Sequence, residues 1–329
     1  MFFRNTFIIK PLHLAKDDHL TFTVTDDERT VVIEIQKIPA EQRQKGYGDN
    51  DLRISATIEI ELSGKRKVQF LDLKSPLSNS VQEFIRPFGL FLYETVIRFI
   101  KTFRWRLRNE NGVNPIRSGG GFAYSPDGKE WKPFPDQVRL ILQWSLPVPQ
   151  QYSPKDLTDV QDLVSVNIPE PVGHELLQEA WELRRTATRS ALVIGLAAAE
   201  TGFKQFSSAQ IPTASWLIEN VPSPPLTKML QNFLPQIPTK LSIYGRVLAP
   251  PDEMIKIINK GVTIRNEIVH GKKATVSSET VEEILNAIRD LLYLLDYYDG
   301  HLWAWAHINP IHLNSLIASA KPPDKEASQ

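Results

Sequence analysis

Residues 175–206 read ELLQEAWELRRTATRSALVIGLAAAETGFKQF, and this stretch decides the fold of the second half of the chain. Apolar residues recur in it at intervals of three and four, the period of a helix that buries one face. The residues expected to face a core are Leu176, Leu177, Ala180, Leu183, Ala187, Ala191, Leu192 and Ile194. The pattern predicts one long helix or a pair of helices separated by a break.

The same helical period continues toward the C-terminus. Pro251 and the two acidic residues after it suit a first helical turn, and Gly271 is placed to end that helix. Ser277 or Ser278 is expected to cap a following helix rich in leucine. We therefore predict an all-helical bundle of four or five helices over residues 171–320.

The first 150 residues have a different pattern, in which short apolar stretches alternate with polar residues or are rich in β-branched ones. A helical spacing covers residues 80–108, Ser118–Gly121 is expected to be a flexible loop, and Tyr124–Trp131 a hairpin turn. A second hairpin is expected to turn at Ser63–Lys65 and return through residues 68–70. The stretches expected to form strands are residues 20–24, 31–35, 53–62 and 138–146.

These two patterns predict an α+β protein with two domains. Residues 1–150 are expected to form a mixed domain with prominent antiparallel strands and one long helix. Residues 151–170 are rich in proline and polar residues and are predicted to be a linker. The helical domain follows over residues 171–320, and residues 321–329 are expected to be a disordered tail.

Composition limits the function without naming it. Of the 329 residues, 42% are hydrophobic and 23% are charged, which is typical of a soluble globular protein. The absence of cysteine excludes disulfides and thiolate metal sites. The net charge is zero, so any contact with RNA has to come from a local patch.

No membrane segment or signal peptide is expected. The first five residues lack the cationic region and long apolar core of a signal peptide. The apolar stretch Leu291–Ile308 is interrupted by Asp296, Asp299 and His301, which a membrane span tolerates poorly. We therefore expect a cytoplasmic protein.

The candidate site is the segment Arg265–His270 at the end of a predicted helix. Asn266 and His270 are four residues apart and share a helix face. Arg265 and His270 are five apart, which places them about 140° apart around a regular helix. They can meet on one ligand only if the last turn unwinds or two copies of the chain come together.

The residue types in this segment suit RNA cleavage. The reaction needs a base for the 2′-hydroxyl proton, an acid for the leaving oxygen, and positive charge on the phosphate. The helix dipole at a C-terminus favours a protonated imidazole, so His270 is placed to exchange protons near neutral pH. Histidine and arginine repeated in two subunits would provide all three functions without a metal.

This motif resembles the signature of HEPN domains, which is an arginine and a histidine separated by four to six residues, with a polar residue directly after the arginine. Here these positions are Arg265, Asn266 and His270, with a glycine and a leucine- and tyrosine-rich helix after them. Upstream, Ala191–Phe206 looks like the HEPN helix that carries a family-typical acid, here Glu200. The resemblance covers roughly half of the chain.

The resemblance implies a four-helix bundle that dimerises with its two motifs facing each other. It implies metal-independent endoribonuclease activity, often within toxin–antitoxin or anti-phage systems, with no cofactor. His270 would act as general base or acid, and Arg265 would hold the scissile phosphate. Asn266 would orient the phosphate or the histidine, and Glu200 would orient the arginine or the base. The implied partners are RNA (tRNA or mRNA), a second copy of the chain, and an antitoxin or a trigger that the first domain senses.

A non-catalytic interpretation uses the same residues. Arg265 would then pair with an acid inside the bundle, His270 would only cap a helix, and Glu200 would be solvated or paired. The helical domain would serve as a HEPN-like module for dimerisation or for binding a nucleotide or RNA.

A second candidate RNA contact lies at Lys101–Arg108, where basic and aromatic residues interleave. Such a stretch can neutralise phosphates and stack on bases. The basic residues of this patch are Lys101, Arg104, Arg106 and Arg108. The alternative is a helix whose aromatic residues are partly buried and whose arginines are solvated. His301 and His307 lack carboxylates at ligand spacing, so no metal site is predicted there.

Overall fold

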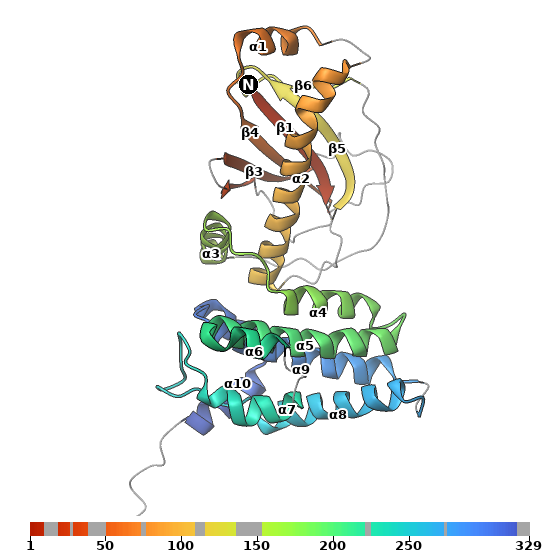
Figure 1. The fold of residues 1–329 in the computed structure, drawn as a ribbon, viewed down its shortest axis with the longest axis vertical. Coiled ribbons are helices and arrows are strands. Elements are labelled where there is room, and N and C mark those ends of the chain that lie inside the picture. The colour runs from red at the N-terminus through yellow and green to blue at the C-terminus, as the bar shows by residue number, and fades with distance from the viewer. Residues whose placement is uncertain are drawn as a thin grey trace, which may run out of the picture. The chain divides into compact units, whose positions relative to one another are not determined.

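The computed structural model describes residues 1–9, 19–26, 29–38, 51–73, 77–108, 116–135, 153–220, 225–272 and 275–320. The chain forms two compact units, Met1–Glu170 and Pro171–Gln329. The first contains a six-stranded antiparallel sheet and the second is largely helical (Figure 1), which confirms the predicted α+β class. The predicted strand at residues 138–146 and the predicted tail lie outside the described residues.

The sheet of the first unit has the strand order β2-β3-β4-β1-β5-β6. The strands are β1 (Phe2–Ile9), β2 (Leu20–Asp26), β3 (Arg29–Lys37), β4 (Leu52–Glu59), β5 (Ile116–Ser125) and β6 (Lys132–Pro133). The helices are α1 (Gly64–Leu71), α2 (Asn79–Leu107) and α3 (Pro154–Ser165). The strands predicted at residues 20–24, 31–35 and 53–62 correspond to β2, β3 and β4, and the predicted long helix is α2.

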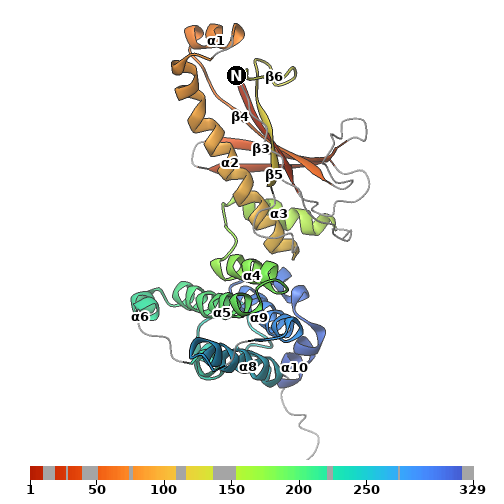
Figure 2. The ribbon, with the colours of Figure 1, turned by 90° about the vertical axis from the view of Figure 1, so that its right-hand side faces the viewer.

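Helix α2 lies across one face of the sheet (Figure 2). Alternate residues of the central strands point toward it, because successive side chains of a strand face opposite sides. Phe3 and Ile58 stand opposite each other on β1 and β4 and are fully buried. On α2, Phe99 and Phe103 complete this core, and the ring of Phe99 lies 4.9 Å from that of Phe22.

Helix α3 covers the free edge of the sheet. The side chain of Gln161 donates to the backbone oxygen of Thr23 on β2 and accepts from its N–H, each at 3.0 Å. A capping box at Ser153 begins α3, and Glu170 is buried within the same unit. The prediction of a linker over residues 151–170 is therefore wrong, because this stretch has apolar residues that pack and a capped helix start. The second compact unit begins at Pro171.

Two local predictions in the first unit are also wrong. Residues 64–71, expected to include a returning strand, form helix α1, whose one buried residue, Phe70, packs against Phe3 of β1. Ser118–Gly121, expected to be a loop, belongs to β5, where β1 supplies the backbone partners and the register shifts along the glycine run. The turn predicted at Tyr124–Trp131 is confirmed, since β5 and β6 pair on either side of it.

The second unit contains seven α-helices among the described residues, joined by shorter helical turns. The α-helices are α4 (Val172–Leu183), α5 (Thr188–Gln210), α6 (Ser215–Asn220), α7 (Leu226–Lys228), α8 (Asp252–Val269), α9 (Ser278–Tyr298) and α10 (Pro310–Ala320). The turns are η2 (Pro212–Ala214), η3 (Met229–Phe233), η4 (Leu234–Gln236) and η5 (Leu302–His307). Across both units, none of the described helices has the length and apolar content needed to traverse a bilayer.

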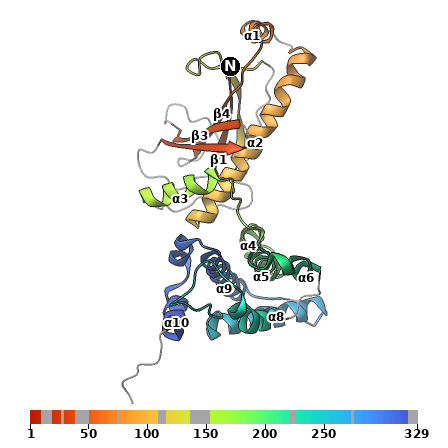
Figure 3. The same ribbon diagram turned by 60° about the vertical axis from the view of Figure 1, so that its left-hand side comes forward.

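Residues 175–206 belong to two helices, α4 and α5. Of the two expectations for this stretch, the pair of helices separated by a break is confirmed. Helices α5 and α9 lie between α4 and α8 (Figure 3). Glycines bring these helices close together. A Cβ added to Gly261 on α8 would lie 2.9 Å from Ile284 of α9. A Cβ added to Gly195 on α5 would clash with Leu285, which also belongs to α9.

Replacing Gly195 with alanine is expected to destabilise the second unit, because the new methyl group overpacks a full core at a cost of about 1–3 kcal/mol. The gain of about 1 kcal/mol that alanine brings to a helix interior offsets only part of this cost, which leaves a net loss of up to about 2 kcal/mol. Gly89 on α2 is a matched control, since nothing lies within 4 Å of a Cβ built there. Gly89→Ala is expected to be neutral or stabilising, and denaturant unfolding of both variants checks the contrast. Equal effects of the two substitutions would contradict the packing argument.

Candidate active site at the end of α8

Both ends of α8 form as the sequence predicted. Asp252 and Glu253 occupy its first turn, where negative charge is favourable. At the other end Gly271 adopts a φ of 70°, which favours glycine. Lys272 N–H donates to Glu267 O at 2.8 Å and Gly271 N–H donates to Ile268 O at 3.0 Å. This pair of bonds closes the helix in a Schellman motif immediately after His270.

The last turn of α8 does not unwind. The helix continues to Val269, and His270 N–H donates to Asn266 O at 3.0 Å in regular helical fashion. Arg265 and His270 therefore remain about 140° apart around the helix axis. Without an unwound last turn, Arg265 and His270 can meet on one ligand only if two copies of the chain come together. Both Asn266 and His270 are exposed.

Arg265 reaches from α8 to Glu200 on α5. Its Nη2 lies 3.5 Å from Glu200 Oε1, and the two side chains are 30% and 33% exposed. The Nε of Arg265 is buried and has no hydrogen-bond partner among the described residues. An unsatisfied buried donor costs about 1–3 kcal/mol. With one long contact and one donor unused, the guanidinium of Arg265 is held only loosely. The structure thus brings together two of the four predicted residues, in a contact that is compatible with both interpretations of the sequence.

A partly apolar strip of α5 continues from Glu200. Val193, Ala197, Glu200 and Lys204 are spaced i, i+4, i+7 and i+11, so they share one face of the helix. Val193 and Ala197 are both exposed, the former to 38%. We call these four residues the α5 strip. It places exposed apolar surface on the same helix face as the acid that contacts Arg265.

The second RNA-contact prediction, at the end of α2, is wrong for its two central arginines. Arg104 is 2% exposed and its Nη2 lies 2.6 Å from Oε2 of the fully buried Glu170. Arg106 is 4% exposed and forms ion pairs with Asp156 and Asp159 of α3. Buried guanidiniums paired in this way do not face a nucleic acid. The flanking basic residues Lys101 and Arg108 are half-buried.

Sequence reasoning missed two buried histidine–aspartate pairs in the second unit. His174 Nε2 on α4 lies 2.8 Å from Asp296 Oδ2 on α9, and His312 Nδ1 on α10 lies 2.7 Å from Asp290 Oδ2 on α9. The partners of the first pair are 122 residues apart, so no local spacing indicates it. The available signal was that Asp290 and Asp296 flank the apolar run 291–295 of α9, since a buried carboxylate requires a partner.

The end of α8 therefore offers a loosely held guanidinium, an exposed amide and an exposed imidazole. These groups are suited to binding a phosphodiester and to moving protons beside it. Within the described ranges, no group of three or more His, Asp or Glu side chains is arranged to hold a metal ion. Comparisons of the chain with protein-family models, with curated proteins and with solved structures find no significant match.

Proposed function

We propose that this chain is a metal-independent endoribonuclease of HEPN type that works as a homodimer. The proposal rests on the exposure and the incomplete hydrogen bonding of Arg265. Its guanidinium is partly exposed, contacts Glu200 only at 3.5 Å, and leaves a buried Nε without a partner among the described residues. A phosphate accepts hydrogen bonds from arginine, and it suits a guanidinium that is partly exposed and only weakly engaged by its acid.

The chemistry assigned to these residues is attack of the 2′-oxygen on the adjacent phosphorus. A bond forms between O2′ and phosphorus while the bond from phosphorus to O5′ breaks. His270, from one or both subunits, takes the 2′-hydroxyl proton or gives a proton to the departing O5′. Arg265 stabilises the charge that develops on the phosphate, and Glu200 positions Arg265. Asn266 orients the phosphate or the histidine. The products carry a 2′,3′-cyclic phosphate and a 5′-hydroxyl.

The regular geometry of α8 supports a site shared between two chains. Because Arg265 and His270 diverge on one helix, the proposal pairs Arg265 of one chain with His270 of the partner subunit. The exposed apolar residues of the α5 strip, together with Val269 at 65% exposure, provide surface that a second copy would cover. Within this proposal the first unit selects the RNA or senses a trigger, and the setting is a toxin–antitoxin or anti-phage system.

The purified protein is expected to cleave total RNA or tRNA in the presence of EDTA. Cleavage needs no divalent ion here because the proposed acid, base and phosphate-binding group are all side chains. Gel analysis measures the cleavage, and end-group analysis of the fragments is expected to show cyclic phosphates and 5′-hydroxyls. Cleavage that appears only with Mg²⁺, or that leaves 5′-phosphates, would contradict the mechanism.

A non-catalytic binding module is the second candidate, and one observation favours it. Arg265 already contacts an acid within the bundle, as a structural arginine would. In that case the protein would bind RNA or a nucleotide and leave it intact. Retention of uncut RNA in the EDTA experiment, at protein concentrations that saturate binding, would place this candidate first.

A further inference from the structure

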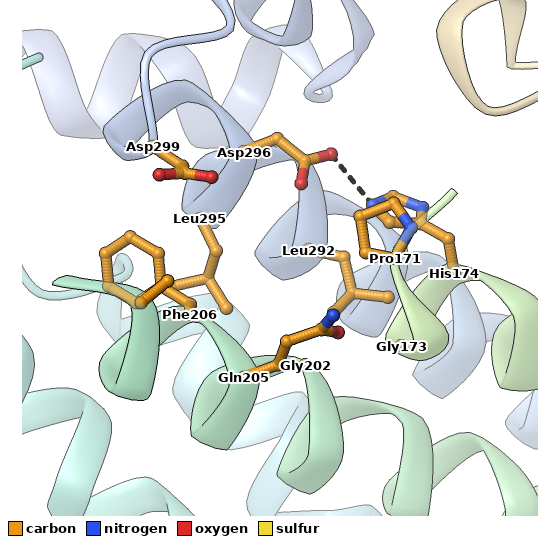
Figure 4. Close-up of a pocket in the computed structure, with 11 residues that line it drawn as sticks. Pro171, Gly173, His174, Gly202, Gln205, Phe206, Leu292, Leu295, Asp296 and Asp299 are labelled. Carbon is orange, nitrogen blue, oxygen red and sulfur yellow. Dashed lines mark hydrogen bonds and ion pairs between the residues drawn. The ribbon is translucent and has the colours of Figure 1, made fainter. Parts of the chain in front are cut away.

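A cavity of about 130 Å³ lies among α4, α5 and α9 of the second unit (Figure 4). Three apolar side chains, Phe206 of α5 and Leu292 and Leu295 of α9, form much of its wall. A volume of this size is several times what one water molecule needs. The cavity therefore has room for a small organic group that packs against apolar side chains.

Two carboxylates border the same cavity. Asp296 lies in the last turn of α9 and Asp299 follows three residues later at the helix end, so both reach the cavity from one helix (Figure 4). Asp296 Oδ2 is hydrogen-bonded to His174 Nε2, and Asp299 Oδ1 is 2.8 Å from Lys240 Nζ. The cavity thus combines apolar walls with an end that accepts hydrogen bonds.

Two carboxylates stand at this end, with His174 beside Asp296 and Lys240 beside Asp299. Gln210 also donates to Asp299 Oδ1, at 2.6 Å. The Lys240 side chain is 64% exposed, and water screens its ion pair with Asp299. Burial is the main cause that lowers the pKa of the nearby His301, and Lys240 and His174 lower it further, against the opposite effect of Asp296 and Asp299. His301 is therefore protonated less readily than an ordinary histidine. An anionic ligand would meet two carboxylates here, whereas a cation would be attracted to them.

We propose that this cavity binds a small organic cation. Its amidinium or ammonium head would donate hydrogen bonds to Asp296 and Asp299. Its apolar body would pack against Phe206, Leu292 and Leu295. This site is separate from the Arg265–Glu200 contact, and the proposal does not depend on the proposed nuclease activity.

Benzamidine is a suitable probe, because it joins an amidinium head to a flat apolar ring. Benzamide has nearly the same shape without the charge and serves as the matched ligand control. Isothermal titration of the full chain is expected to show benzamidine binding in the millimolar range or tighter, and at least about tenfold tighter than benzamide, as expected for hydrogen bonds to a charged group. Absence of benzamidine binding, or equal affinity for the two ligands, would overturn the proposal.

Substitutions of acidic residues on α9 test whether benzamidine binds in this cavity. Asp296→Asn is expected to weaken benzamidine binding by roughly tenfold or more, since it removes one charged acceptor. Asp290→Asn is the matched control, because Asp290 also lies on α9 and pairs with a histidine but does not line the cavity. Binding that is unchanged by Asp296→Asn, or weakened equally by Asp290→Asn, would overturn the assignment.

Asp296 is buried, so its variant carries a risk of misfolding, and two further variants keep the test decisive. Asp299→Asn alters a half-buried carboxylate at the helix end, and Ala209→Leu places a larger side chain at an exposed position that lines the cavity. Both are expected to retain the circular dichroism of the native chain and to weaken benzamidine binding. Native-like affinity in both would overturn the assignment.

Discussion

Replacing His270 with alanine is expected to lower the rate of RNA cleavage by roughly 10²–10⁴-fold, the factor that general acid–base catalysis typically contributes. The fold is expected to survive, because His270 is exposed and ends α8 through its backbone N–H, which alanine retains. Initial rates on labelled tRNA in EDTA measure the loss, and thermal unfolding verifies that the variant is folded.

Lys260→Ala is the matched control on the same helix. Lys260 pairs with Glu283 at the surface, where such a pair contributes about 0–1 kcal/mol, and it lies outside the motif. This control is expected to cleave RNA at the native rate. Native cleavage by the His270 variant, or an equal loss in both variants, would rule out the assigned role of the histidine.

A mixing experiment extends this prediction to the shared site. Arg265→Ala and His270→Ala are each expected to be inactive as homodimers. In a mixed dimer, however, one of the two sites would combine the intact Arg265 of one chain with the intact His270 of the other. Activity that returns after the two variants are unfolded and refolded together supports a site built from two chains. Failure to regain activity, with mixed dimers shown to form, contradicts it.

Replacing Glu170 with alanine is expected to lower the free energy of unfolding of the first unit by about 3–5 kcal/mol, the usual effect of removing one member of a buried ion pair. Arg104 donates to Glu170 from both Nε and Nη2 at 2.6–3.1 Å, and both side chains are almost fully buried. The substitution leaves the guanidinium in a low-dielectric interior without this counter-charge. Denaturant unfolding followed by hydrogen exchange in the sheet measures the loss.

The control for this prediction replaces both members with apolar residues. Arg104→Met combined with Glu170→Leu is expected to be much less destabilising than the single substitution, because no charge is left buried. Hydrogen exchange in α8 and α9 serves as an internal reference for the second unit. A double variant as unstable as Glu170→Ala would show that packing, not charge, dominates at this position.

The elements that sequence predicted well are those whose signals are local. The start and end of α8, including Gly271, follow from residues within one helical turn, and the alternation in β2 and β4 follows from one buried face. The failures depend on contacts made elsewhere in the chain. Helix α1 is fixed by packing of Phe70 against Phe3, and the glycine run in β5 is held by pairing with β1.

In the candidate site, too, local features could be predicted from the sequence and contacts between distant residues could not. The helical positions of Arg265 and His270 could be predicted, because both lie on one helix with clear boundaries. The contact between Arg265 and Glu200 joins residues 65 apart and was expected only through the family resemblance. Arg104 and Arg106 were misassigned because a basic helix segment has the same sequence whether its charges face solvent or acids contributed by residues 156–170.

The bond between Gln161 and the outer strand of the sheet has a consequence for self-association. An exposed edge strand is a template on which a foreign strand can add, and such growth leads to aggregation. The Gln161 amide occupies both backbone groups of Thr23 and so imitates one residue of a neighbouring strand. Addition of another chain at this position requires α3 to detach first. Aggregation through this edge then depends on the local opening of α3, which does not require the unit as a whole to unfold.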